Sequence, residues 1–463
     1  NKHVLTVEGL ANGDELHPLQ EAFVKLGATQ CGFCTPGQLM TSYALLAKNP
    51  NPSEEEIKYA LKDTLCRCGA YPAIVRAVQA AAEKIRTGKD ITFPDLPESR
   101  DTRVIGHLVK RPEAIAKVIG EAKYTDDFSV PGMLHARTLR AGVPHAILKK
   151  LDISRAKELP GVRAVLTADD IRGRVNHGLV IFDWPALIAV GQKIRYMGDA
   201  IAIVAAETRE IATQALSLIE TDYELLPVVA TSIDARKPDA PQVHESGNLL
   251  KHIKVNKGNI DTGFEESDYV FEDRFETPPY DHAYMEPECS IARILDDGKI
   301  EVYVGSQIPY SDRSQVAAAM NVDEEKVRVI GTLIGGGFGG KEDIVGQIHA
   351  VMLAQATGRP VKMLYDRQES LVVHPKRHAT YLRVKLGFKN DGTMIAAQTE
   401  LTGDTGAYAS LGEKVLTRAT THSTGPYVIP HVKADCFAMY TNNPPAGAFR
   451  GFGVLQSAFA IES

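Results

Sequence analysis

The segment GATQCGFCTPG, at positions 27–37, carries two cysteines separated by two residues, and LCRCG at positions 65–69 carries a second pair. Turns that bring four thiolates together create a site for a soft metal centre, either a structural zinc ion or a [2Fe-2S] cluster. Structural zinc sites favour two to four residues within each pair, so the single residue between the last two cysteines suits two irons better. The spacing therefore predicts that a [2Fe-2S] cluster is bound by Cys31, Cys34, Cys66 and Cys68.

The sequence around these cysteines has the apolar spacing of short helices. Ser53 stands where a helix N-cap is expected, and Glu56 follows at the capping-box position. Apolar side chains recur at helical intervals in residues 16–26, 38–47 and 73–85. We predict a helical domain over residues 1–86, a four-helix bundle with the cysteines in the turns between its helices.

The remaining sequence divides by composition and pattern. Residues 87–112 are rich in proline and charge, which predicts a linker. Residues 113–235 alternate strand-like and helical patterns, which predicts a smaller α/β domain, and residues 236–463 form a larger α/β region in which strands dominate. The predicted fold class is therefore α+β with several domains. Strands are predicted at 163–166, 200–205, 269–276, 289–294, 300–305, 327–332, 361–365 and 380–388, and helices at 207–219, 312–320 and 344–356.

A glycine-rich segment, GGGFGGKE at positions 335–342, lies between a predicted strand and a predicted helix. Successive glycines let backbone N–H groups approach an anion closely, and a helix start favours negative charge. No Ser or Thr follows Lys341, which excludes a P-loop, and no early βαβ unit surrounds the segment, which argues against a dinucleotide fingerprint. By itself the segment fits a nucleotide site or a tight turn.

Composition excludes several classes of protein. The 463 residues carry a formal net charge of −6 without a basic block, which excludes the electrostatic footprint of a nucleic-acid or anionic-membrane protein. No apolar run approaches the roughly 18 to 20 residues that span a bilayer. The chain begins with Asn1, carries no secretory signal and ends in an apolar stretch, so we expect it to continue at both ends in a longer protein or in partner chains, and to be cytoplasmic.

The cysteine segments resemble the second iron–sulfur domain of the xanthine dehydrogenase and aldehyde oxidoreductase family of molybdenum hydroxylases, which is a four-helix bundle. The resemblance implies that Gln30 and Cys68 also contact the pterin cofactor. It further implies a ferredoxin-like [2Fe-2S] domain, with four more cysteines, that must lie elsewhere.

The glycine-rich segment resembles the molybdenum-cofactor loop of the same family, and TNNP at 441–444 followed by AFRGFG at 448–453 resembles a second cofactor loop. Residues 118–124, 131–134, 159–162 and 196–199 resemble the family's smaller, hammerhead-type domain, and 285–287 and 403–408 the larger one. The chain thus resembles an iron–sulfur domain fused to the first part of a molybdopterin-binding region that is incomplete at its C-terminus. The implied cofactor-binding residues are Gln30, Cys68, Gln307, Gly337, Phe338, Gly339, Phe449, Arg450, Gly451 and Phe452.

Substrate residues follow from the same resemblance. Gln307 takes the position of an amide that hydrogen-bonds the metal's oxo ligand, and Glu342 and Arg418 take positions that recognise a purine in xanthine dehydrogenases. The other interpretation of Glu342 is a carboxylate placed by a helix N-terminus. The resemblance favours oxidation of a purine-like N-heterocycle, with water as oxygen source and electrons passed to iron–sulfur clusters. The alternatives are an aldehyde oxidoreductase with the same cofactors and a subunit that only transfers electrons.

The resemblance also implies partners. The family's catalytic base is a Glu of the later molybdopterin-binding region, which this sequence does not contain, so we expect another chain or region to supply it. No flavin domain separates the two parts of the chain, so FAD, if used, is expected on a partner flavoprotein. The pterin is expected in a dinucleotide form.

Overall fold

The computed structural model describes residues 4–92 and 111–463. The chain forms two compact units, which we call the N-terminal unit and the larger unit. The N-terminal unit extends to Phe128 and also contains Ala283–Glu286 and Thr332–Gly336, and all other residues belong to the larger unit. Most of the predicted linker 87–112 lies outside the described residues. In the part of the chain that is described, no helix has the length and apolar character needed to cross a membrane.

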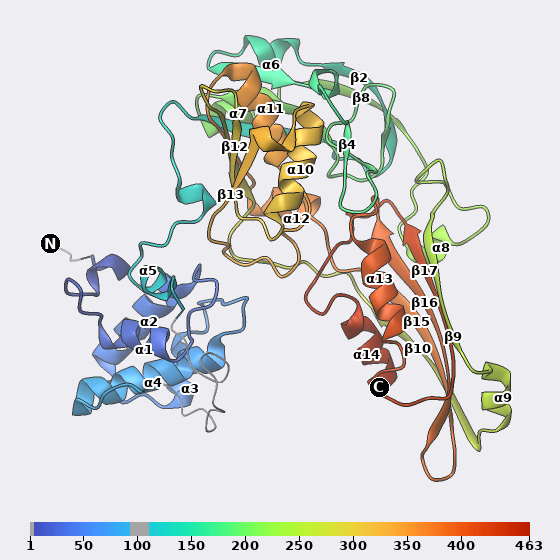
Figure 1. Ribbon diagram of the computed structural model, residues 1–463. Coiled ribbons are helices and arrows are strands. Elements are labelled where there is room, and N and C mark those ends of the chain that lie inside the picture. Colours follow the sequence, from blue (N-terminus) through green and yellow to red (C-terminus); the bar gives the residue numbers. More distant parts are fainter. Residues whose placement is uncertain (1–3, 93–110) are drawn as a thin grey trace. The chain divides into compact units, whose positions relative to one another are not determined.

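The N-terminal unit is helical (Figure 1). Ser53 caps α3 as predicted: its Oγ accepts a hydrogen bond from the Glu56 backbone N–H at 3.2 Å, and Glu56 Oε2 accepts one from the Ser53 N–H at 2.8 Å. Fully buried Leu19, Phe23 and Ile74 belong to α1 and α4, which pack together. The elements are η1 (Val7–Gly9), α1 (Pro18–Lys25), α2 (Thr35–Lys48), α3 (Glu54–Ala60), α4 (Tyr71–Thr87), α5 (Ala114–Val118) and η2 (Thr125–Asp127).

A seven-stranded mixed sheet forms one part of the larger unit, in the order β13-β12-β11-β14-β1-β7-β3. The strands are β13 (Val327–Gly331), β12 (Ile300–Val304), β11 (Cys289–Ile294), β14 (Val361–Leu364), β1 (Leu134–Arg140), β7 (Ala200–Ala206) and β3 (Val162–Leu166). The helices around it are α6 (Ser154–Glu158), η3 (Ala168–Asp170), α7 (Arg209–Leu216), α10 (Pro309–Met320), η4 (Glu324–Lys326), α11 (Gln347–Thr357) and α12 (Arg367–Val373).

At strand β7, this sheet is buried on both of its faces. All seven of its residues are buried, and its sequence AIAIVAA lacks the polar alternation of a half-exposed strand. Ile203 and Ala205 belong to the core that includes α10 and α11, whereas Ala202 and Val204 belong to the core that includes α6 and α7. Both faces of β7 are therefore covered by helices.

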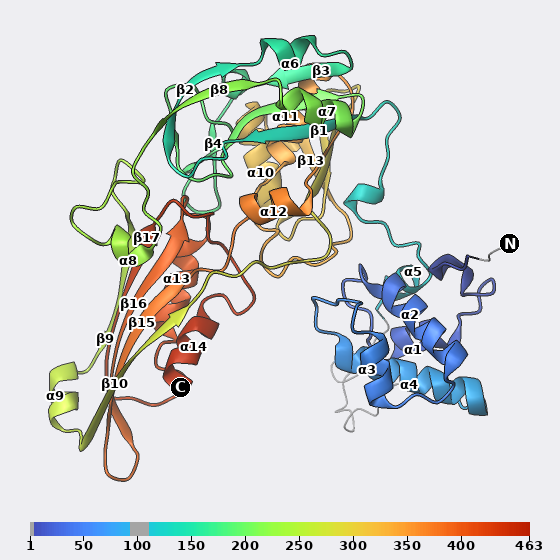
Figure 2. The ribbon, with the colours of Figure 1, turned by 180° about the vertical axis from the view of Figure 1, so that it is seen from behind.

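The other main layer of the larger unit is a five-stranded sheet in the order β10-β15-β16-β17-β9. Helices α13 and α14 pack along one side of it, as both views show (Figures 1 and 2). The strands are β10 (Tyr269–Thr277), β15 (Thr380–Phe388), β16 (Met394–Gly406), β17 (His431–Tyr440) and β9 (Leu249–Lys257). The helices are α8 (Ser232–Ala235), α9 (Ile260–Glu265), α13 (Gly412–Thr421) and α14 (Val454–Glu462).

The segment 129–235 differs from the α/β pattern that its alternation predicts. Its strands pair with one another only in antiparallel fashion, in β1–β7, β3–β7, β2–β6, β2–β8 and β4–β5. The single parallel partner of this segment is β14, which pairs with β1. Alternation of strands and helices alone does not set strand direction. The remaining strands are β2 (Ala146–Asp152), β4 (Asn176–His177), β5 (Trp184–Pro185), β6 (Lys193–Ile194) and β8 (Glu220–Leu225).

Candidate iron–sulfur and molybdopterin sites

The four clustered cysteines lie in the two turns beside α2 and α4, and none of them forms a disulfide. The thiols of Cys31 and Cys68, of Cys68 and Cys66, and of Cys66 and Cys34 lie close enough to shift one another's pKa. Hydrogen bonding among these thiols lowers the pKa of Cys31 and Cys66 and raises the pKa of Cys34 and Cys68. The structure therefore brings together all four predicted ligands.

A [2Fe-2S] cluster distributes four thiolates over two irons, and the two turns supply two thiols each.

The turn that carries Cys31 is held by residues far along the chain. Gly32 has a φ of +90°, and a Cβ there would lie 2.6 Å from the Lys117 side chain and 2.7 Å from the Tyr124 hydroxyl. Lys117 Nζ donates to the Gln30 carbonyl at 3.0 Å, and the Tyr124 hydroxyl donates to the Cys31 carbonyl at 2.8 Å. Only glycine fits this close approach of backbone to side chain. The exposed Gln30 side chain thus projects from a fixed turn.

The first residues of the glycine-rich segment belong to the N-terminal unit. Gly335 N–H donates to Glu286 Oε2 at 2.6 Å, and the Glu286 N–H donates to the Gly335 carbonyl at 3.2 Å. A Cβ on Gly335 would lie 2.6 Å from the Phe33 ring. The turn between the first two cysteines therefore packs directly against the start of this segment.

In the larger unit, Gln307 packs against the rest of the glycine-rich segment. Its Oε1 accepts hydrogen bonds from the Gly339 N–H at 2.9 Å and the Lys341 N–H at 3.4 Å. A Cβ on Gly337 would lie 2.3 Å from the same oxygen. The exposed Gln307 side chain therefore packs closely on the backbone of the glycine-rich segment.

The segment AFRGFG packs directly against the glycine-rich segment. Gly339 has a φ of +102°, and a Cβ there would lie 2.5 Å from the Ala448 carbonyl oxygen. The Arg450 N–H donates to the Phe338 carbonyl at 2.9 Å. Phe338 and Phe452 both adopt positive φ, of 57° and 45°, which is uncommon for aromatic residues. The structure thus gathers Gln307, Gly337, Phe338, Gly339, Phe449, Arg450, Gly451 and Phe452 into one surface region.

Two residues that sequence reasoning missed hold Phe449 in place. The buried His282 ring stacks on the Phe449 ring at 4.2 Å, and His282 Nε2 contacts the Ala448 carbonyl at 2.7 Å. The Arg377 guanidinium lies 3.9 Å from the Phe449 ring centre and donates to the Arg450 carbonyl at 2.8 Å. Phe449 therefore contacts a histidine ring and a guanidinium group. No local motif predicts either contact.

The two predicted substrate residues are not joined by any contact that the structure gives. Glu342 is the last residue of the glycine-rich segment and is partly buried, and this burial raises the pKa of its carboxyl group. It stands five residues before the first residue of α11, Gln347, so a place in the first turn of that helix does not explain it. Arg418 is exposed on α13.

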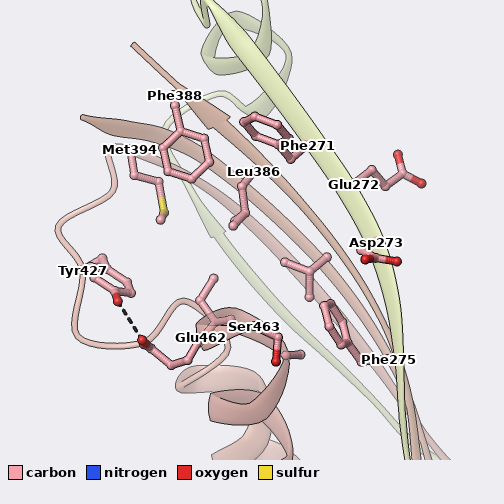
Figure 3. A pocket seen from close by; sticks show the side chains of 13 residues that line it. Phe271, Glu272, Asp273, Phe275, Leu386, Phe388, Met394, Tyr427, Glu462 and Ser463 are labelled. Atoms are coloured by element: carbon pink, nitrogen blue, oxygen red, sulfur yellow. Dashed lines mark hydrogen bonds between the residues drawn. The ribbon is translucent and has the colours of Figure 1, made fainter. Parts of the chain in front are cut away.

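A separate hollow of about 580 Å³ lies between β10, β15 and the end of α14 (Figure 3). Its lining is mainly apolar and includes Phe271, Leu386, Phe388 and Met394, with Tyr427 donating to Glu462 at 2.9 Å. None of the predicted site residues lines it. This hollow is therefore distinct from the surface around Gln307.

Comparison with known proteins agrees with this arrangement. Residues 6–79 match the [2Fe-2S] binding domain family, residues 119–227 the aldehyde oxidase and xanthine dehydrogenase a/b hammerhead domain, and residues 243–463 the molybdopterin cofactor-binding domain. The nicotinate dehydrogenase large molybdopterin subunit of Eubacterium barkeri is 42% identical over 365 residues, which cover 78% of this chain and 85% of that protein. The chain belongs to the xanthine dehydrogenase and aldehyde oxidoreductase family of molybdenum hydroxylases.

Two other members of this family are also similar to the chain. A probable xanthine dehydrogenase subunit of Bacillus subtilis is 42% identical over 76% of this chain and 47% of its own length. The solved structure of the aldehyde oxidoreductase from Desulfovibrio gigas has a TM-score of 0.93 and 31% identity, and the match covers 98% of this chain and 52% of that one. The chain therefore spans about half the length of these two relatives.

This molybdenum hydroxylase chain carries a [2Fe-2S] domain and a molybdopterin-binding domain, and the residues present fit both groups. Four unbridged thiols in two neighbouring turns match the donor set that a [2Fe-2S] cluster requires. For the pterin, the Gln307 carboxamide and the backbones of the glycine-rich and AFRGFG segments gather in one region, where Cβ atoms at Gly337 and Gly339 would intrude. Such fixed donors are suited to orient a bound cofactor.

Proposed function

We propose that this chain is the cofactor-bearing part of a molybdenum hydroxylase that oxidises a purine-like N-heterocycle. The observation that carries the proposal is the gathering of Gln307, the glycine-rich segment and the AFRGFG segment, with Glu342 as the last residue of the glycine-rich segment. When bound, the molybdenum cofactor supplies the oxygen-transfer and electron-accepting chemistry. The protein positions this cofactor and the substrate.

Glu342 is the residue that favours a heterocycle. Partial burial raises the pKa of its carboxyl group, which extends the pH range of the protonated form that donates a hydrogen bond. A carboxyl group that both donates and accepts can pair with the ring nitrogen and carbonyl groups of a purine. Two relatives at 42% identity also carry names, xanthine dehydrogenase and nicotinate dehydrogenase, that denote nitrogen heterocycles. We propose that Arg418 stabilises developing negative charge on the same ring.

The finer assignments belong to the same proposal. Gln30, Cys68, Gln307 and the loop residues Gly337–Gly339 and Phe449–Phe452 would contact the pterin, in a dinucleotide form. Cys68 would also serve as the electron path to the cluster. The domains would be a four-helix [2Fe-2S] bundle at 1–86, a linker at 87–112, a hammerhead-type domain at 113–235 and the molybdopterin-binding region from 236.

The proposal also includes partners. A further chain or region would supply the catalytic Glu and the rest of the molybdopterin site, and a ferredoxin-like [2Fe-2S] domain would carry the second cluster. A flavoprotein subunit would hold FAD where FAD is used. The assembly would act in the cytoplasm.

The test uses the natively purified complex. We expect molybdenum and iron together, and turnover of xanthine or hypoxanthine. Glu342→Gln should lower kcat/KM for the heterocycle by at least about tenfold and leave aldehyde turnover within about twofold, because the substitution replaces one carboxyl oxygen by an NH2 group that cannot accept a hydrogen bond, which penalises only a substrate that donates to that oxygen. The exposed Glu325→Gln is the matched control and should change neither activity.

The outcomes separate the rival functions. Aldehyde turnover without heterocycle turnover, and no effect of Glu342→Gln, would establish the aldehyde oxidoreductase, which the TM-score of 0.93 to such an enzyme supports as second candidate. Iron without molybdenum would establish a subunit that only transfers electrons.

A further inference from the structure

Three consecutive residues of one loop each donate a hydrogen bond to a different aspartate of the larger unit. The Tyr408 hydroxyl donates to Asp199 Oδ1 at 2.8 Å, and the Ala409 N–H donates to Asp183 Oδ2 at 2.9 Å. The Ser410 hydroxyl donates to Asp343 Oδ2 at 2.8 Å. Asp183 and Asp199 come from the hammerhead region, whereas Asp343 directly follows Glu342. The last of these bonds therefore ties the end of the glycine-rich segment to a distant loop.

Asp343 also lies against the start of the AFRGFG segment. Only 3% of its surface is exposed. A Cβ on Gly447 would lie 3.1 Å from Asp343 Oδ2 and 2.9 Å from Ser410 Oγ, so the Gly447 backbone packs directly on this pair. One carboxyl group thus joins three segments that meet at the cofactor loops.

Ser410 adopts a backbone conformation that is uncommon for a residue other than glycine. Its φ is +40°, in the left-handed region that non-glycine residues enter at a cost of about 1 to 3 kcal/mol. The hydrogen bond to Asp343 is the side-chain interaction that fixes it there. Strain held in this way is typical of loops that must keep one geometry.

The surroundings of Asp343 are acidic. The charged groups near enough to influence it are Glu342, Asp183 and Asp312, and burial together with these groups opposes its ionisation. Burial and acidic neighbours are among the largest influences on Asp343, so its environment favours hydrogen bonding to Ser410.

We propose that Asp343 is a positioning residue that holds Glu342 at the substrate side of the molybdopterin site. The inference rests on the proposed function and deepens it. Consecutive Cα atoms lie about 3.8 Å apart across a trans peptide, so fixing Asp343 through Ser410 and Gly447 restricts where Glu342 can lie. Asp343 acts through Glu342 and takes no part in the chemical step.

A double-mutant cycle in the natively assembled complex tests this. Asp343→Ala should lower kcat/KM for the heterocycle by at least about tenfold, mainly through KM, and leave aldehyde turnover within about twofold. In the Glu342→Gln background the same substitution should change heterocycle turnover by less than about twofold, because residues that act through one another are not additive. Molybdenum content and equilibrium binding of xanthine to the complex should be measured alongside; molybdenum should stay at the parental value, and xanthine affinity should fall only when Glu342 is present.

Ser410→Ala removes the other partner of the bond and keeps the test decisive if Asp343→Ala does not fold. It should reproduce the heterocycle-specific loss, and Asp343→Asn, which keeps an acceptor oxygen, should largely restore activity. Equal losses for heterocycle and aldehyde, additive effects in the cycle, or loss of molybdenum would overturn the positioning role. If Glu342→Gln itself has no effect, the proposed function fails; if only the Asp343 variants have none, the positioning role alone fails.

Discussion

Gly339 lies where the glycine-rich segment packs against the AFRGFG segment. Its φ is +102°, and a Cβ would lie 2.5 Å from a backbone carbonyl oxygen, that of Ala448, which cannot move as a side chain could. Gly339→Ala should therefore separate the glycine-rich segment from the AFRGFG segment and lower bound molybdenum by more than about fivefold, at a stability cost of about 1 to 3 kcal/mol. Molybdenum per chain and the thermal midpoint measure this.

Gly331→Ala is the matched control for that variant. A Cβ on Gly331 would have no atom within 4 Å, and this residue does not adopt a left-handed φ, so its substitution should leave molybdenum content and the thermal midpoint unchanged. Full molybdenum content in Gly339→Ala would refute the close-packing argument.

The buried Asp343 predicts a pH dependence of stability. Burial raises the pKa of this carboxyl group to about 7, above the value of about 4 for an unfolded aspartate. Between these values the folded state holds a proton that the unfolded state has lost, so stability falls as pH rises from about 4 to 7. Asp343→Asn should consequently gain thermal stability over the parent at about pH 8, by at most a few kcal/mol, with the gain vanishing toward about pH 4.

The control for this pH effect is the exposed Asp323→Asn, whose melting difference from the parent should not vary with pH over this range. If the difference in thermal stability between Asp343→Asn and the parent stays constant from about pH 4 to about pH 8, the Asp343 carboxyl group does not titrate in this interval.

At the scale of elements, helix α3 depends on its cap. It has only seven residues, and Ser53 Oγ satisfies the Glu56 N–H at its start. Ser53→Ala should destabilise the N-terminal unit by about 1 kcal/mol, because an N–H at the helix start loses its acceptor. Hydrogen exchange of the α3 amides and the thermal midpoint measure the loss. Glu55→Gln, exposed in the same helix, should stay within about 0.5 kcal/mol of the parent.

Elements with a strong local pattern could be predicted from the sequence. The strands at Cys289–Ile294 and Thr380–Phe388 have the predicted bounds, and the helix predicted at 312–320 is the C-terminal part of α10. Strand β16 was missed because Gly403 and Asp404, which favour turns, lie within it. Its central place between β15 and β17 overrides that preference, and this tertiary pairing is not visible locally.

The candidate site was likewise only partly predictable from the sequence. The cysteines, the glycine-rich segment and the AFRGFG segment could be found as motifs. His282, Arg377 and the Asp343–Ser410 pair could not, because each depends on a contact between residues 67 to 166 positions apart in the chain. Single buried His, Arg or Asp residues occur throughout protein cores, so a sequence alone gives no reason to select them.

At the scale of the whole molecule, the four clustered cysteines belong to the N-terminal unit, whereas Gln307 and most of the residues proposed to contact the pterin belong to the larger unit. Cys34→Ser should remove about two iron atoms per chain, because a proposed cluster ligand is lost. Molybdenum content should remain close to the parental value, because Cys34 is not among the residues proposed to contact the pterin. Metal analysis and the visible absorption of the cluster measure this. Cys436→Ala, a buried cysteine outside the cluster, should retain iron. Joint loss of iron and molybdenum would contradict the separation.

The five-stranded sheet has two ends, and they carry opposite charge. Among the described residues, β9 stands at one end with exposed Lys251, Lys254 and Lys257, and β10 stands at the other with exposed Glu272, Asp273 and Glu276. Two copies that met through these ends would join unlike edges in a head-to-tail contact, which closes into a ring only if the rotation between copies allows it and otherwise continues into open arrays. Added salt screens that attraction, so ionic strength is the first variable to set when the protein is concentrated.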